Sequence, residues 1–230
     1  MPVIEVSGVS QVYGAGAARR TVLDGVEVML SENRIGVVGS NGSGKSTFAR
    51  LLNGLVEPTR GTVTVDGLDT VREGRAVRQK VGFCFTDPDS QIVMPTVRED
   101  VAFGLRRKGL RGAAADPVVD DALARFGLSA LADSPAHTLS GGEKQLLALC
   151  SVLITEPDVL VLDEPTTLLD LRNARRIGDV VASLPQQVLL VTHQLDLLAG
   201  FDRVLVFDEG RLVHDDAPAG AVDHYRRLMA

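Results

Sequence analysis

The sequence has few of the features that mark secreted or membrane-spanning proteins. None of its apolar runs approaches the roughly 20 residues that a transmembrane helix needs. Its first residues, Met-Pro-Val-Ile-Glu-Val, have neither the basic nor the apolar region of a signal peptide. Only two cysteines occur, Cys84 and Cys150, and both lie inside apolar runs, so buried, reduced thiols are expected. We predict a cytosolic protein without a Cys/His metal site.

The charges form no basic stripe. Lysine and arginine together number 24 against 30 aspartates and glutamates, and both signs are interspersed along the chain. A dedicated nucleic-acid binder normally carries a stripe of basic residues, so no nucleic-acid partner is expected. With 45% apolar residues, the chain of 230 residues can bury a substantial core. Its length fits one α/β domain with subdomains.

Apolar, β-rich segments predict strands, and several of them are short continuous runs bounded by turn residues, as in strands buried on both faces of a sheet. They lie at Ile35–Val38, Thr62–Val65, Val81–Phe85, Val159–Leu162, Val188–Val191 and Val204–Phe207. Helical segments separate the later runs, which favours a largely parallel sheet. A hairpin is expected around Asp208-Glu209-Gly210. The predicted fold class is α/β, a largely parallel core sheet with an antiparallel β edge subdomain.

The middle of the chain predicts a helical subdomain at residues 87–151, inserted into a core formed by residues 1–86 and 152–230. It contains three helix-start signals, the capping boxes Thr96/Glu99 and Ser140/Glu143 and the pair Asp116-Pro117. The stretch 106–115 is rich in basic residues, glycine and alanine, and we expect a solvated loop there.

A glycine-rich loop lies between an expected strand and an expected helix. Residues 39–46 match G-x-x-x-x-G-K-[ST] at every fixed position, with strand Ile35–Val38 before them and helix Thr47–Leu52 after them. The backbone N–H groups of such a loop converge on phosphate oxygens. Lys45 supplies a charge for the β- and γ-phosphates, and the Ser46 hydroxyl can ligate Mg²⁺. The residues expected to bind the nucleotide are Gly39, Ser40, Asn41, Gly42, Ser43, Gly44, Lys45, Ser46 and Thr47.

An acidic pair follows the strand predicted at Val159–Leu162. Asp163, at the end of the strand, can reach Mg²⁺ through water, and Glu164 can point at the γ-phosphate and polarise the attacking water. A strand that ends in Asp-Glu also occurs as a plain solvated turn. The phosphate-binding loop earlier in the chain favours the catalytic interpretation.

A serine- and glycine-containing stretch distinguishes among the many proteins with such a loop. The stretch Leu139-Ser140-Gly141-Gly142-Glu143-Lys144-Gln145 resembles the signature motif of ABC ATPases. It predicts an anion site in which Ser140 and the N–H groups of Gly141 and Gly142 face a ligand at a helix N-terminus. In ABC proteins this element reaches the nucleotide of the other subunit, so the resemblance implies a dimer that encloses ATP.

The resemblance covers essentially the whole chain and implies roles for three further residues. Tyr13 is similar to the aromatic residue on which adenine stacks, an interaction of roughly 1–3 kcal/mol by analogy with base stacking. Asp170 ends the stretch Thr167–Asp170, which stands in the place of the D-loop, a segment that crosses the dimer interface in ABC ATPases. His193 matches the switch histidine that contacts the γ-phosphate. As isolated residues, Tyr13 and His193 would be ordinary packing and surface side chains.

One position departs from the family pattern. Thr86 stands where the family usually has a glutamine that ligates Mg²⁺ and links the site to the membrane partner. Threonine is shorter by about two bonds, so contact of Thr86 with the metal is expected through water or not at all. The expected metal set is therefore Ser46, Asp163 and, indirectly, Thr86.

The stretch from Asp87 to Gly104 resembles the energy-coupling-factor importers within the ABC family. Overall, the chain is most similar to the ATPases of biotin importers and next to those of cobalt importers. These take up vitamins and transition-metal ions with two ATPase subunits, a membrane coupling protein and a substrate-binding membrane protein. The resemblance implies an ATPase that uses ATP and Mg²⁺, bound peripherally at the cytoplasmic face of the membrane as a homo- or heterodimer. Gln91 is expected near the groove that receives the partner's coupling helix.

Two other functions stay open at this point. An ABC ATPase acting on DNA or ribosomes would need a coiled-coil insertion or a second cassette, and the sequence contains neither. A regulatory nucleotide-binding module without turnover is disfavoured by Lys45, Asp163, Glu164 and His193.

Overall fold

The computed structural model describes residues 1–230, apart from the side chain of Ala17. Its central layer is a 6-stranded sheet in the order β10-β9-β3-β8-β7-β6. The strands are β3 (Arg34–Gly39), β6 (Val81–Cys84), β7 (Val159–Asp163), β8 (Gln187–Val191), β9 (Arg203–Asp208) and β10 (Arg211–Asp216). Neighbours are parallel from β6 to β9, and β10 pairs antiparallel with β9 through the predicted hairpin. The largely parallel core sheet is confirmed.

A second, antiparallel sheet has the order β2-β1-β4-β5. It contains β1 (Ile4–Tyr13), β2 (Arg20–Leu30), β4 (Arg60–Val65) and β5 (Leu68–Asp69). The strand predicted at Thr62–Val65 is present and lies in this sheet as part of β4. The sequence pattern missed β1 and β2, whose residues alternate between buried and exposed. A search for continuous apolar runs finds strands buried on both faces, not strands with one solvated face.

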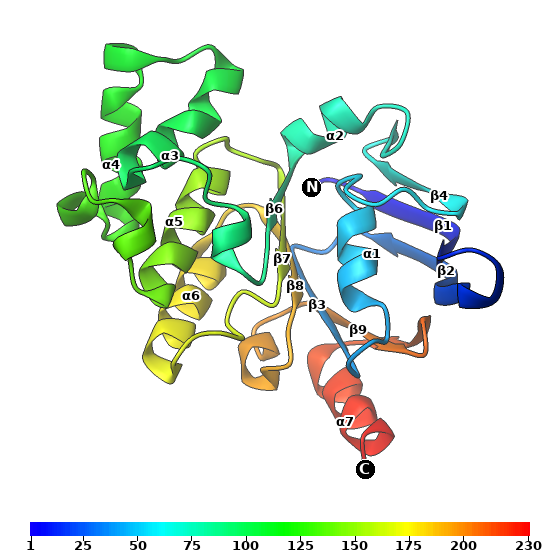
Figure 1. The fold of residues 1–230 in the computed structure, drawn as a ribbon. Helices are drawn as coiled ribbons and strands as arrows, with labels where there is room; N and C mark the ends of the chain where they lie inside the picture. Colours follow the sequence, from blue (N-terminus) through cyan, green and yellow to red (C-terminus); the bar gives the residue numbers. More distant parts are fainter.

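Helix α1 (Lys45–Leu51) lies between the two sheets (Figure 1). Phe48 and Leu51 of α1 are fully buried among residues of both sheets. Its start is two residues earlier than the predicted Thr47, directly at the end of the glycine-rich loop. The short helix α2 (Gly74–Lys80) precedes β6 on the same side of the molecule.

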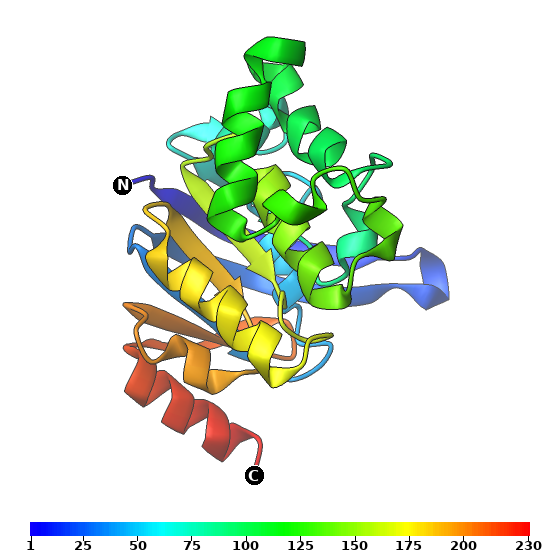
Figure 2. The same cartoon turned by 90° about the vertical axis from the view of Figure 1, so that its left-hand side faces the viewer.

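The opposite face of the core sheet is covered by helices (Figures 1 and 2). They are α5 (Gly141–Leu153), α6 (Leu171–Ser183) and α7 (Pro218–Leu228), while α3 (Val97–Leu105) and α4 (Asp116–Phe126) pack on α5. Alternate residues of one strand serve the two faces, since Leu160 packs with these helices and Val161 packs with α1. In the described part of the chain, no helix combines the length and apolar character that crossing a bilayer requires.

The helical block contains the predicted local signals. Both capping boxes are present, at Thr96/Glu99 before α3 and at Ser140/Glu143 before α5, and Gly127 ends α4 in a left-handed conformation. Residues 106–115 are not simply a solvated loop: 3-10 turns form at η3 (Arg106–Lys108) and η4 (Gly112–Ala114), and Ala115 is buried in the helical core.

The two cysteines lie in the core. Cys84 and Cys150 are both buried and free, as predicted, and burial raises the pKa of each thiol to about 12. Both side chains therefore stay protonated at neutral pH and act as small apolar groups.

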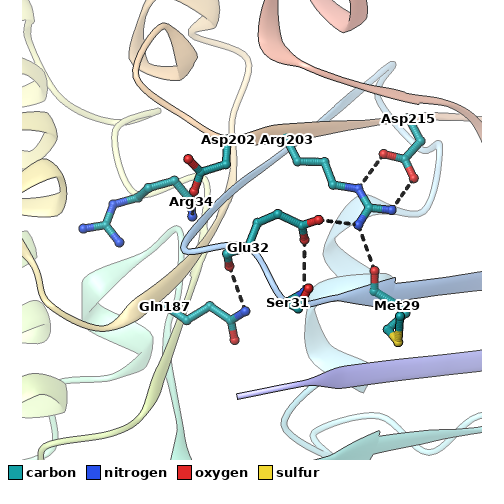
Figure 3. A network of polar contacts seen from close by, with 8 residues as sticks. All are labelled: Met29, Ser31, Glu32, Arg34, Gln187, Asp202, Arg203 and Asp215. Carbon is teal, nitrogen blue, oxygen red and sulfur yellow. Dashed lines mark hydrogen bonds and ion pairs between the residues drawn. The ribbon is translucent and has the colours of Figure 1, made fainter. Parts of the chain in front are cut away.

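A network of polar contacts joins the two sheets at the start of β3 (Figure 3). Arg203 of β9 pairs with both carboxylate oxygens of Asp215, at 2.7 and 2.6 Å, and donates to the Met29 carbonyl and to Glu32, each at 2.9 Å. Gln187 donates to the Glu32 carbonyl at 2.8 Å. Burial acts to raise the pKa of Glu32, but hydrogen bonds from backbone N–H groups and from Arg203 outweigh it and lower that pKa. The network anchors the end of β3 opposite the glycine-rich loop.

Candidate nucleotide-binding and catalytic site

The glycine-rich loop connects the end of β3 to the start of α1. Gly44, the residue before α1, has a φ of +100°, which L side chains rarely adopt. A Cβ atom at Gly44 would also come within 2.7 Å of the Val22 carbonyl oxygen. The loop can therefore curl tightly against β2 only with glycine here, and its N–H groups gather at the N-terminus of α1.

Lys45 is almost fully buried at the centre of this loop, with 5% of its surface exposed. Its Nζ donates to the Gly39 and Ser40 carbonyl oxygens, both at 2.9 Å. Burial lowers the pKa of Lys45, while the carboxylates of Glu164 and Asp163 act to raise it. The ammonium is thus held within the loop, where it can turn from carbonyl oxygens to a bound phosphate.

Ser46 and Asp163 meet beside the lysine. The Ser46 hydroxyl donates to Asp163 Oδ1 at 2.8 Å, and Arg50 Nη2 of α1 lies 3.5 Å from Asp163 Oδ2. Only 1% of the Asp163 side chain is exposed, and burial raises its pKa. Among the described residues, Oδ2 has no hydrogen-bond partner. A buried carboxylate oxygen that accepts no hydrogen bond, next to a serine hydroxyl, fits the oxygen ligands that Mg²⁺ prefers.

Glu164 lies next along the chain in a conformation that is unusual for a residue with a side chain. Its φ is +51°, and its N–H donates to the Val191 carbonyl at 3.0 Å. Its carboxylate pairs with His193 Nε2 at 2.9 Å and accepts a hydrogen bond from Thr167 Oγ1 at 2.8 Å. The two residues predicted to be catalytic, Glu164 and His193, are therefore in direct contact at the ends of adjacent strands.

A cavity of about 280 Å³ brings most of the predicted nucleotide contacts of the loop together, but not Gly39, Ser40 or Ser43. It is lined by Tyr13, Arg20, Val22, Asn41, Gly42, Gly44, Lys45, Ser46, Thr47 and Glu164. Tyr13 is 44% exposed at its edge, as an aromatic ring available for stacking would be. Arg20 and Val22 were not predicted: Arg20 pairs with Tyr13 across β1 and β2, so recognising that hairpin would have identified it.

The signature residues do not line this cavity. Ser140 caps α5 and, with Gly141 and Gly142, stands at its N-terminus, while Asp170 caps α6 by accepting from the Asn173 N–H at 2.8 Å. Gly142 lies against the Asn173 side chain, so the N-termini of the two helices are adjacent. Their contact with a nucleotide in another subunit stays a prediction.

Thr86 contacts the backbone of Asp163, one of the predicted metal ligands. Its hydroxyl donates to the Asp163 carbonyl oxygen at 2.7 Å, so it supports the end of β7. Its contact with Mg²⁺ through water stays a prediction. The neighbouring Gln91 accepts from the Phe85 N–H and donates to the Ala148 carbonyl of α5, both at 3.1 Å. Gln91 thus joins the end of β6 to α5, the helix that begins with the signature residues.

Comparison with known proteins assigns the family. The model of the family described as ABC transporter matches residues 23–167. The biotin transport ATP-binding protein BioM of Rhizobium etli is 51% identical over 98% of each chain, and the energy-coupling factor transporter ATP-binding protein EcfA1 of Latilactobacillus sakei is 35% identical over 99% of this chain and 82% of its own. The structure of cbiO1 from Clostridium perfringens, part of the ABC transporter complex cbiONQ, superposes with a TM-score of 0.82 at 31% identity, covering 98% of this chain and 92% of that one. This chain belongs to the ABC transporter family, as an ATP-binding subunit.

Proposed function

We propose that this chain is the ATP-hydrolysing subunit of an energy-coupling-factor importer, which drives uptake of a vitamin or a transition-metal ion. Biotin is the favoured substrate, because BioM, a biotin transport protein, is more similar to this chain (51% identical) than EcfA1 is (35% identical). The second relative is named for an energy-coupling factor transporter and the similar structure for an ABC transporter complex. The partners would be a second ATPase subunit, a membrane coupling protein and a substrate-binding membrane protein, with this chain peripheral at the cytoplasmic face.

One observation carries the catalytic part of the proposal. Lys45, Ser46 and Glu164 line the same cavity as Tyr13, and Asp163 is bonded to Ser46 beside it. These are a cation for phosphate, two oxygen ligands for a metal, a base for water and a ring for adenine. A regulatory module that does not hydrolyse ATP would not need the Glu164 carboxylate in contact with His193.

The side chains divide the chemistry among them. Lys45 would leave the carbonyl oxygens of its loop for the terminal phosphates, while Ser46 and Asp163 would hold Mg²⁺, which neutralises phosphate charge when bound. Glu164 would take a proton from the attacking water as general base. His193, bonded to Glu164 in this structure, would orient that carboxylate and contact the γ-phosphate.

The site is proposed to be completed by a second subunit. Ser140, Gly141, Gly142 and Asp170 stand at adjacent helix N-termini outside the cavity, where backbone N–H groups favour an anion. Leu168 and Leu171 flank Asp170 and are 67% and 76% exposed. These two apolar side chains are accessible for a second subunit to cover.

Motion would pass to the membrane partner through a second cavity of about 370 Å³. Its lining joins β6 of the core to α3 and α5 of the helical block and includes Gln91, Val93 and Phe103. The side chains of Val93 and Phe103 are exposed and offer apolar contact to a coupling helix. Because Gln91 joins β6 to α5, the helix that begins with the signature residues, movement of α5 relative to the core would displace a helix docked here.

Glu164→Gln tests the catalytic assignment. The amide keeps an oxygen that can accept from His193 or Thr167 but cannot take a proton, so turnover should fall by roughly 10²–10⁴, while Mg-ATP binding persists and an ATP-bound dimer accumulates. Phosphate release should be measured on the chain co-purified with its membrane partners, whose identification also tests the transport assignment. Near-normal turnover would remove Glu164 from the catalytic role.

A further inference from the structure

The last helix of the chain, α7, is held firmly against the core sheet beside the end of β3 (Figure 1). Asp216, the last residue of β10, accepts from the Ala217 N–H at 2.7 Å and so fixes the start of α7. Ala221, on the face of α7 that packs on the sheet, is fully buried. The rings of His224 and His214 stack with centroids 4.2 Å apart. The helix is therefore a fixed platform rather than a loose tail.

Tyr225 extends from this platform to the phosphate-binding loop. Its hydroxyl donates to the Gly39 carbonyl oxygen at 3.3 Å, which is long for a hydroxyl donor. The same oxygen accepts from Lys45 Nζ at 2.9 Å. Burial and the Glu164 carboxylate raise the pKa of Tyr225, so the phenol keeps its proton at neutral pH and remains a donor.

Gly39 cannot adjust easily to the loss of a donor. Its φ is +154°, and a Cβ atom there would lie 2.2 Å from the Phe207 carbonyl oxygen and 2.7 Å from Ser43 Oγ. The backbone is thus packed closely on β9 and on its own loop, so the peptide has little room to rotate its carbonyl toward another donor. A partly buried carbonyl that loses its donor costs free energy.

We propose that Tyr225 is a positioning residue for nucleotide binding, because its hydroxyl holds the Gly39 carbonyl when Lys45 leaves that oxygen for the phosphates. In the free protein the two donors share the carbonyl, and the tyrosine bond is long. Once the ammonium turns away, the phenol can shorten its bond and keep the loop in place. The proposal rests on ATP binding alone, so failure of the importer proposal would leave it intact.

Mg-ATP affinity, measured by calorimetry, is the first test. Tyr225→Phe removes only the hydroxyl and should weaken binding by about fivefold, the usual worth of one such hydrogen bond. His224→Ala is the matched control, because it removes the ring stack that docks α7 but leaves the hydroxyl, and it should change affinity by less than about twofold. Equal weakening by both variants, or none by Tyr225→Phe, would overturn the proposal.

A double-mutant cycle on the nucleotide-free protein is the second test and does not depend on activity. With Lys45 in place, Tyr225→Phe should change the unfolding equilibrium little, since the lysine still serves the carbonyl. In a Lys45→Met background, Tyr225→Phe should raise the equilibrium constant for unfolding by about fivefold. Additive effects would show that the two side chains do not share the Gly39 carbonyl, and the proposal would be wrong.

Discussion

Replacing Gln91 by alanine tests how the helical block is joined to the core. The side chain makes two hydrogen bonds to backbone atoms, with the Phe85 N–H and the Ala148 carbonyl, both partly buried. Each contributes a net 0.5–1.5 kcal/mol on average, so their loss should lower the free energy of unfolding by about 2 kcal/mol. For a chain of this length the melting temperature should fall by about 4–8 °C.

Asp89→Ala is the matched control for that measurement. Asp89 lies on the same loop and pairs with Lys144 of the same helix at 2.7 Å, but its side chain is 63% exposed. An exposed ion pair contributes little, at most about 1 kcal/mol, so the melting temperature should change by less than about 4 °C.

The functional consequence of Gln91→Ala should appear in the assembled transporter. Mg-ATP affinity should be unchanged, because the residue does not line the nucleotide cavity, while the amount of solute transported per ATP hydrolysed should fall. A melting temperature like that of the wild type, together with normal transport, would show that Gln91 neither ties β6 to α5 in solution nor contributes to coupling.

Three further substitutions probe the site and its support. Lys45→Ala should weaken Mg-ATP binding by about 10–100-fold, as loss of a hydrogen-bonded charge does, and unchanged affinity by calorimetry would mean that the site is misplaced. Thr86→Ala should change ATPase activity little and cost about 1 kcal/mol of stability through the lost bond to the Asp163 carbonyl; abolished turnover would instead make Thr86 a functional replacement for the family's glutamine. Because the pKa of Glu32 is lowered from 4.5 in the folded state, its contribution to stability is present at neutral pH and lost as pH falls below about 4.5. Arg203→Ala should therefore show a shallower loss of stability between about pH 5 and pH 3 in denaturant titrations, and an unchanged slope would contradict the role of Arg203.

Features that depend on neighbouring residues could be predicted from the amino-acid sequence. The phosphate-binding loop is contiguous, and the capping boxes at Thr96 and Ser140 join residues three positions apart. Strands buried on both faces, such as β7 and β8, are recognised in the sequence as continuous apolar runs. In each case the physical requirement acts within a few residues, so the residue types alone display it.

Contacts that join distant segments could not be predicted from the sequence and are seen in the folded structure. Arg20 lines the cavity beside Tyr13 and Lys45 because β2 pairs with β1, and those strands alternate between buried and exposed residues without a continuous apolar run. Thr86 meets the Asp163 carbonyl 77 residues away, and Tyr225 meets Gly39 at a separation of 186. A hydroxyl finds either partner only after the sheet has placed β6 beside β7 and α7 beside β3, and no local spacing encodes that placement.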